Sequence, residues 1–143
     1  MQVFIVGTPL ETAMALDPRR LNKQIIETRQ ILDALNGAKA WSNHPCTLQY
    51  RGHDLWLRNY MKCLYAYRSG DVFSAECFSG ACECIRPVFH TEEYFNQMKR
   101  RLVTKNEILY SQWAHLGTSE INHYFVDNEW RYYKNGKRVK ESI

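Results

Sequence analysis

The sequence predicts a mainly α protein, in which residues 1–143 form a single compact helical domain with a small C-terminal β-hairpin or meander. Two observations predict the helices. Several stretches carry apolar residues at spacings of three and four, and residues typical of helix caps bound these stretches. A third observation predicts the sheet, since residues 123–139 alternate aromatic and polar side chains. A chain of 143 residues is long enough for one domain with a real core.

The longest predicted helix begins at Asp17 and Pro18. Asp17 is a favourable N-cap, and Pro18 at the first helical position gives up no hydrogen bond. Asn36-Gly37 is a typical helix stop, so the helix ends near Leu35. Its predicted core stripe is Leu21, Ile25, Thr28, Leu32 and Leu35.

Glu27 lies on a flank of this helix, away from the stripe, and shares that flank with Arg20 and Lys23. Two interpretations stay open. Lys23 and Glu27 are four residues apart and can form an ordinary exposed pair worth roughly 0.2–0.5 kcal/mol. Alternatively, Glu27 is a carboxylate beside a basic surface that binds a polyanion, where it can act as acid, base or charge stabiliser.

The first half of the chain contains three further predicted elements. Gln2 to Val6 is a short apolar run, either a strand or an extended arm, and Leu10 to Leu16 is a short helical turn. A second long helix opens at Tyr50 to Asp54 and continues to about Arg68, before Gly70.

The second half begins with an irregular region, residues 71–87, predicted as loop or short strand. Thr91 caps a helix, and residues 104–107 fit a capping box for a last helix that ends near His115. Asp127-Asn128 and Asn135-Gly136 are the expected turns of the hairpin or meander.

Composition favours an intracellular protein that binds a polyanion. Nineteen Lys and Arg against 15 Asp and Glu give a net charge of +4, a mild excess that matters where it is gathered on one face. The clusters Arg19-Arg20, 99–101 and 134–140 suggest such gathering. No apolar run approaches the roughly 18 residues that span a bilayer, so we expect a soluble, cytoplasmic protein without a membrane partner.

The five cysteines predict reduced thiols rather than a disulfide framework, because their number is odd and no export signal is evident. Cys46 and Cys63 are most simply small buried groups. Cys77, Cys82, Cys84 and His90 could together bind zinc, but their spacing lacks the familiar two-residue knuckle. The expectation is therefore no metal and no cofactor, with this zinc site as the alternative.

Two local features bear on chemistry. The α-amino group of residue 1 is partly neutral at physiological pH, with an ordinary pKa near 7.7–8.0, and can act as a nucleophile unless it is frayed and idle. The aromatic residues of the C-terminal strands, with Lys134 beside them, could stack on bases and meet phosphates, or could pair across strands to seal the core edge. These strand residues are Trp130, Tyr132, Tyr133 and Lys134.

Three motifs resemble one family. They are the run L-D-x-R-R-L-x-K-Q-x-x-E-x-x-Q-I-L from Leu16 to Leu32, W-x-N-H-P from Trp41, and R-G-H-D from Arg51. Together they are similar to the pyrimidine-dimer DNA glycosylase/AP-lyase family, the endonuclease V-like enzymes and their small cytoplasmic relatives. The segment from Trp130 to Lys137 is similar to the aromatic, basic tail of that family.

The resemblance implies an endonuclease V-like helical fold and double-stranded, damaged or modified DNA as the partner. It places the catalytic carboxylate on Glu27 and makes the amine at the start of the chain the nucleophile that attacks the sugar C1′ and forms an imine. Because Gln2 replaces the small residue that the family exposes, that nucleophile is the amine of Met1. Ile26 replaces a basic residue of the family.

Candidate DNA contacts come from the cations near Glu27 and from residues of the next turn, each of which could equally be a solvated side chain. They are Arg19, Arg20, Lys23, Arg29, His44, Arg51 and His53. We therefore expect an N-glycosylase for DNA lesions with possible AP-lyase activity. The alternatives are a non-catalytic module on the same fold, which binds nucleic acid or protein, and a zinc-stabilised interaction protein.

Overall fold

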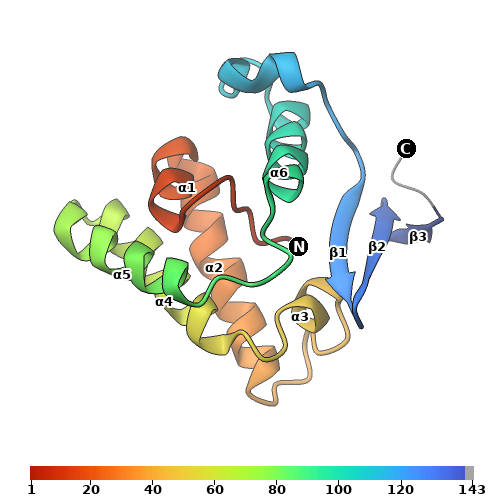
Figure 1. Cartoon of the computed structure of the whole chain (residues 1–143), viewed down its shortest axis with the longest axis horizontal. Helices are drawn as coiled ribbons and strands as arrows, with labels where there is room; N and C mark the ends of the chain where they lie inside the picture. Colours follow the sequence, from red (N-terminus) through yellow and green to blue (C-terminus); the bar gives the residue numbers. More distant parts are fainter. Residues whose placement is uncertain (141–143) are drawn as a thin grey trace. The chain divides into compact units, whose positions relative to one another are not determined.

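A computed structural model describes residues 1–140 as a mainly α protein with a small three-stranded sheet near the C-terminus, as the sequence predicts (Figure 1). Contacts divide the chain into two compact units, Met1–Val88 and Phe89–Ile143, which are considered separately below. That residues 1–143 form one domain stays a prediction.

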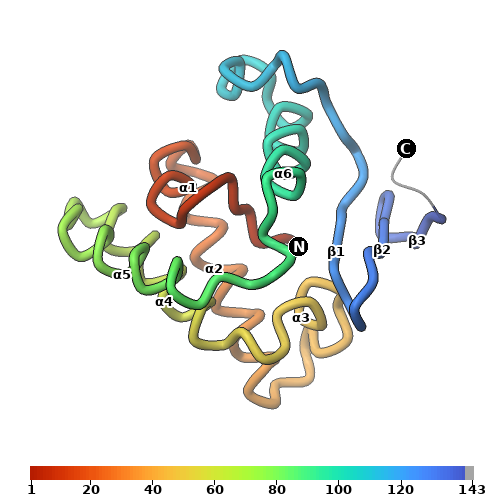
Figure 2. The backbone as a smooth tube through the Cα atoms, in the orientation of Figure 1, coloured from red at the N-terminus to blue at the C-terminus, as the bar shows by residue number. Residues whose placement is uncertain are grey.

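The first unit consists of an extended N-terminal arm and five helices. Residues 2–6 are buried and pair with no strand, so this segment is the expected extended arm and not a strand (Figure 2). Helix α4 packs against α1, α2 and α5. The helices are α1 (Pro9–Ala15), α2 (Pro18–Leu35), α3 (Pro45–Gln49), α4 (Asp54–Arg68) and α5 (Val72–Cys84).

Helix α2 has the boundaries that its sequence predicts. The Asp17 side chain accepts a hydrogen bond from the Arg20 backbone N–H at 3.4 Å, and Pro18 occupies the first turn. The buried face differs in detail from the predicted stripe, because Ile25 is only half-buried and Gln24 is 2% exposed. This polar residue is buried because it binds the N-terminal arm.

The core of the first unit contains a column of aromatic rings. Tyr50 stacks on Trp56 with centroids 5.6 Å apart, and Trp56 stacks on Tyr60 at 5.0 Å. The three rings are at most 1% exposed, so they anchor α4 and the turn before it. The Tyr60 hydroxyl also donates to the Phe4 carbonyl, which ties the arm to α4.

The prediction for residues 71–87 is wrong, because most of this region is helix α5. Asp71 caps it by accepting from the backbone N–H of Ser74 at 3.1 Å and from the Ser74 hydroxyl at 2.7 Å. Its buried side chains Ala75, Ser79 and Cys82 are small and follow the helical spacing. The helix also carries apolar residues such as Phe73 on its exposed side, and this hides the period in the sequence.

Within residues 89–140, the second unit contains one α-helix, one 3-10 helix and an antiparallel sheet of order β1-β2-β3. Thr91 caps its helix as predicted, by accepting from the Tyr94 backbone N–H at 3.2 Å. The two strand connections have positive φ at Asp127, Asn128, Asn135 and Gly136, so both predicted turns form and give the meander. The elements are α6 (Glu92–Lys105), η1 (Ser111–Leu116), β1 (Asn122–Val126), β2 (Glu129–Lys134) and β3 (Lys137–Val139).

The predicted last helix is present only in part. Residues 111–116 form the 3-10 helix η1, which ends close to His115 as predicted but begins later than the capping box implies. Thr104 does not cap a new helix. It lies in the last turn of α6, where its hydroxyl bridges the Arg100 and Ser119 carbonyls at 2.8 and 3.0 Å. Among residues 1–140, no helix is both long enough and apolar enough to cross a membrane.

Candidate active site

The start of the chain is held in place by the amide of Gln24 on α2. Its Nε2 donates to the Gln2 carbonyl at 2.7 Å, and its Oε1 accepts from the Phe4 backbone N–H at 3.0 Å. The Tyr60 hydroxyl lies 3.1 Å from the same Oε1. One buried amide thus binds the arm as a neighbouring strand would, and fixes its course past α2.

Glu27 is in contact with this arm. Its Oε2 accepts a hydrogen bond from the Gln2 backbone N–H at 3.3 Å, and its Oε1 lies 4.0 Å from Nζ of Lys23. The Glu27 side chain is 13% exposed, whereas that of Lys23 is 69% exposed. Glu27 is therefore not part of an ordinary exposed helix pair. It is a largely shielded carboxylate that contacts Gln2, the residue after Met1.

His44 and Cys46 also lie close to the arm's first residues. His44 is the N-cap of α3, and its Nδ1 accepts from the Cys46 backbone N–H at 3.1 Å. Burial, and to a smaller extent the positive charge of the N-terminal amine, lower the pKa of His44 to about 4. His44 is therefore neutral at pH 7.

The Cys46 thiol is close to the N-terminal amine and to Glu27. The pKa of Cys46 is raised to about 12, mainly by burial and further by the Glu27 carboxylate. A hydrogen bond from the Val3 backbone and the positive charge of the N-terminal amine oppose this rise. The amine of Met1, Glu27, His44 and Cys46 consequently share one electrostatic neighbourhood.

The predicted cations are distributed unevenly around this site. Arg20 is paired with Asp17 at 3.1 Å, whereas Arg19 and Arg51 are exposed and form no ion pair within residues 1–140. Burial lowers the pKa of His53, the residue that precedes α4, and the negative charge of Asp54 opposes this shift. Arg19, Lys23 and Arg51 are thus three of the predicted contacts that present their charge to solvent.

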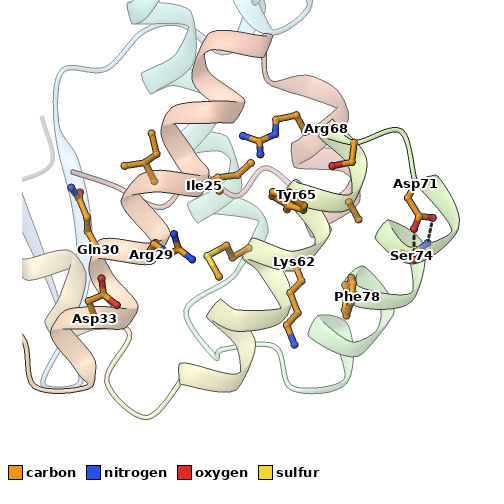
Figure 3. Close-up of a pocket in the computed structure, with 14 residues that line it drawn as sticks. Ile25, Arg29, Gln30, Asp33, Lys62, Tyr65, Arg68, Asp71, Ser74 and Phe78 are labelled. Carbon is orange, nitrogen blue, oxygen red and sulfur yellow. Dashed lines mark hydrogen bonds between the residues drawn. The ribbon is translucent and has the colours of Figure 1, made fainter.

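Arg29 points into a separate groove, which the helices α2, α4 and α5 line (Figure 3). Two residues along a helix correspond to about 200°, so Arg29 and Glu27 lie on opposite sides of α2. The groove has a volume of about 690 Å³ and apolar walls that include Ile25, Tyr65 and Phe78. Glu27 is not among its lining residues, so the structure does not bring Arg29 to the carboxylate.

The C-terminal aromatic residues form cross-strand pairs. Trp130 contacts Phe125 with centroids 5.2 Å apart, and Tyr132 contacts His123 at 4.9 Å. Tyr133, on the other face of β2, contacts Tyr124 at 5.6 Å, and Lys134 Nζ lies 3.6 Å from Glu120. The pairing interpretation is confirmed, and base stacking by these residues stays a prediction.

The zinc alternative finds no support in the described part of the chain. Within residues 1–140, no group of three or more His, Cys, Asp or Glu side chains could hold a metal ion. Cys77 and Cys84 are exposed on α5, whereas the buried Cys82 donates to the Trp56 carbonyl at 3.4 Å. His90 is buried and stacks on Tyr94 at 5.8 Å.

Sequence analysis missed the positioning role of Gln24 and the place of Cys46 beside the amine. Gln24 carries no signal of its own, because a polar residue on an amphipathic helix is expected to face solvent. Cys46 is recognised only when the contact between α3 and the arm is known.

Comparison with protein families gives one match. The model of the family described as pyrimidine dimer DNA glycosylase matches residues 1–67. This segment contains the arm, Glu27, His44, Cys46 and nearly all of α4. Searches of curated proteins and of solved structures found no match.

Proposed function

We propose that the chain, whose residues 1–67 match the model of the pyrimidine dimer DNA glycosylase family, releases a damaged base from double-stranded DNA. In this proposal the α-amine of Met1 is the nucleophile and Glu27 is the acid, base or charge stabiliser. AP-lyase activity, the cleavage of the strand at the resulting site, is the second step of the same proposal.

The chemistry begins with the neutral amine. Its lone pair forms a bond to the sugar C1′, the C1′–N bond to the damaged base breaks, and the base leaves with that electron pair. Loss of a proton from the amine and opening of the sugar ring then give an imine. Glu27 can stabilise the positive charge that develops on the sugar, and can carry the protons that these steps move.

Strand cleavage follows from the same intermediate. The imine makes the C2′ proton acidic, a base removes it, and the 3′ phosphate leaves by β-elimination. The shielded position of Glu27 supports this role, because a carboxylate screened from water interacts more strongly with developing charge.

The observation that carries the proposal is the hydrogen bond from the Gln2 backbone N–H to Glu27 Oε2 at 3.3 Å. It supports the proposal because Gln2, the residue that follows Met1, contacts the carboxylate to which the family resemblance assigns the catalytic role. The same contact also offers a second assignment. If Met1 were removed, the α-amine of Gln2 would itself lie against Glu27.

Borohydride reduction tests the proposal, because it converts the imine into a stable bond between protein and DNA. Duplexes with one abasic site or one cyclobutane dimer are incubated with the chain and with Glu27→Gln. We expect trapping by the unaltered chain and at least a hundredfold loss in the variant. Mass spectrometry of the trapped N-terminal peptide then identifies whether Met1 or Gln2 carries the sugar.

Glu76→Gln is the matched control, since Glu76 is an exposed carboxylate on α5 and the variant makes the same change of charge. It should trap DNA as well as the unaltered chain does. Salt-sensitive DNA binding without any trapping would contradict the enzyme proposal and favour the alternative, a non-catalytic binding module on the same fold.

A further inference from the structure

Trp41, in the turns before α3, is an aromatic residue that plays no part in the proposed chemistry. It is 45% exposed, so it contributes little to the core. The Ser42 backbone N–H donates to the Lys39 carbonyl at 3.3 Å, and the His44 backbone N–H donates to the Trp41 carbonyl at 3.1 Å. Trp41 is thus the third residue of one turn and the first residue of the next.

The backbone of Trp41 is in the left-handed region, with a φ of 64°. A turn with positive φ at its third residue favours glycine or asparagine there, because a bulky side chain is strained in this region. Within residues 1–140, every other residue with positive φ is Gly, Asn or Asp. Backbone strain at a residue that the core does not require indicates that the side chain has a functional use.

The indole of Trp41 is connected to the candidate active site through a short series of contacts. It meets the His44 ring edge to face, with centroids 5.6 Å apart. His44 Nδ1 accepts from the Cys46 backbone N–H, and the Cys46 thiol accepts from the Val3 backbone of the arm. The residue before Val3 in the arm contacts Glu27. The same small group of residues therefore holds both the indole and the start of the chain.

The segment around Trp41 is suited to a polyanion. Residues 34–53 contain no Asp or Glu. The exposed Lys39 and Arg51 of this segment form no ion pair within residues 1–140. A DNA duplex offers phosphates to such cations and, between its base pairs, an apolar space that a flat ring can enter. Cations and an exposed ring on one segment therefore favour nucleic acid over an apolar partner.

We propose that Trp41 inserts its indole into the base-pair stack beside the damaged nucleotide and stacks on the neighbouring bases. The inference rests on the proposed function, which makes damaged duplex DNA the ligand. Proteins that kink DNA insert apolar side chains in this way, and the cost is lowest where a base is missing or weakly stacked. The His44 ring supports the indole from one side, so less side-chain freedom is lost on binding.

The test uses a duplex in which one tetrahydrofuran residue replaces a nucleotide. This abasic analogue has no C1′ hydroxyl group and cannot form an imine, so binding is measured apart from the chemistry. Fluorescence anisotropy compares its dissociation constant with that of the fully paired duplex. We expect the unaltered chain to prefer the tetrahydrofuran duplex roughly tenfold or more, and Trp41→Asn to reduce this preference roughly fivefold or more.

Further variants separate stacking from folding. Trp41→Asn should keep or raise the melting temperature, because asparagine tolerates positive φ. Trp41→Phe keeps a flat ring and should retain most of the preference. Phe73→Asn, which removes an exposed aromatic ring from α5, is the matched control and should retain all of it. A preference that persists in Trp41→Asn, or that Trp41→Phe loses equally, would overturn the proposal, as would a loss that accompanies a fall in the melting temperature of Trp41→Asn.

Failure of this inference is distinguishable from failure of the proposed reaction. A single-stranded abasic oligonucleotide has no base-pair stack, so Trp41→Asn should be trapped on it as the unaltered chain is, whereas Glu27→Gln should not. Trapping without any preference for the tetrahydrofuran duplex would contradict the role of Trp41 alone. A preference that depends on Trp41, without any trapping, would contradict the reaction alone.

Discussion

Glu27 is distinguished from the other carboxylates of its helix by its surroundings. Asp17 serves as a cap and pairs with Arg20, and Asp33 is exposed near the end of α2. Glu27 alone among the three contacts the start of the chain, with one oxygen toward Gln2 and the other toward Lys23. Glu27 therefore contacts both a backbone N–H of the arm and an exposed lysine.

His44 provides a prediction for pH dependence. Its pKa is lowered from 6.5 to about 4, chiefly by burial, so between these values the unfolded chain binds a proton that the folded chain does not. Stability should therefore fall as pH is lowered from about 6.5 toward 4. The slope from this group should stay below about 1.4 kcal/mol per pH unit, because His44 is half-exposed and solvent screens its charge.

His44→Asn should flatten this part of the stability profile. Asparagine keeps a side-chain acceptor for the Cys46 N–H and is itself a good N-cap, so the helix start is retained. Urea unfolding between pH 4 and 7 measures the effect. His115→Asn, at an exposed position of η1, serves as the control, and an unchanged slope in His44→Asn would refute the assignment.

At the scale of elements, the N-terminal arm depends on α2 for its hydrogen bonds. Gln24→Leu should destabilise the fold by about 2–6 kcal/mol, because the buried Phe4 N–H and Gln2 carbonyl each lose a hydrogen-bond partner, at a cost of roughly 1–3 kcal/mol per group. Urea unfolding measures the loss. Any trapping of DNA should decrease as well, since the arm would no longer hold the amine beside Glu27.

Gln30→Leu is the matched substitution on the same helix. Gln30 lines the groove and makes no hydrogen bond within residues 1–140, so its replacement should change stability by less than about 0.5 kcal/mol. Similar losses in both variants would mean that the amide contacts of Gln24 do not hold the arm.

The elements that the sequence predicts well have local signals at both ends. Helix α2 begins at Asp17-Pro18 and ends before Asn36-Gly37, and the meander follows from Asp127-Asn128 and Asn135-Gly136. Helix α5 shows no clear contrast between a buried and an exposed face, because small and apolar residues occur on both. Residues 107–115 have a helical composition, but the chain there tightens into η1 against α6.

The candidate site was predictable only in part. Glu27 and Met1 follow from the resemblance, and the contact with Gln2 fits the expectation that the start of the chain meets the acid. Gln24 and Cys46 could not be found in the same way, because their roles depend on contacts between residues 20 or more positions apart. Tertiary packing decides which polar residue of an amphipathic helix turns inward.

On the scale of the whole molecule, the formal charge of +4 overstates the cations that are available to DNA. In the second unit, Arg131, Lys134 and Arg138 all pair with nearby carboxylates. Arg19 and Arg51 of the first unit form no ion pair within the described residues. A count of charges along the sequence does not distinguish cations that pair with carboxylates from cations that form no ion pair.

This difference predicts the salt dependence of DNA binding. Each phosphate contact contributes about 0.9 to the slope of log K against log salt, so replacing both Arg19 and Arg51 by Gln should reduce the slope by about 1.8. Fluorescence anisotropy with a labelled abasic duplex at several salt concentrations measures it. Arg58→Gln, at an exposed site on α4, should leave the slope unchanged, and an unaltered slope in the double variant would exclude both contacts.

The distribution of the thiols makes the chain ready for site-directed labelling. Cys77 and Cys84 are exposed and lie seven residues, about two turns, apart on α5. Burial raises the pKa of Cys63 to about 11 and those of Cys46 and Cys82 to about 12, so these three supply almost no reactive thiolate at neutral pH. A maleimide fluorophore would therefore attach to one side of α5 in the unaltered protein, without engineered cysteines and without disturbing the interior.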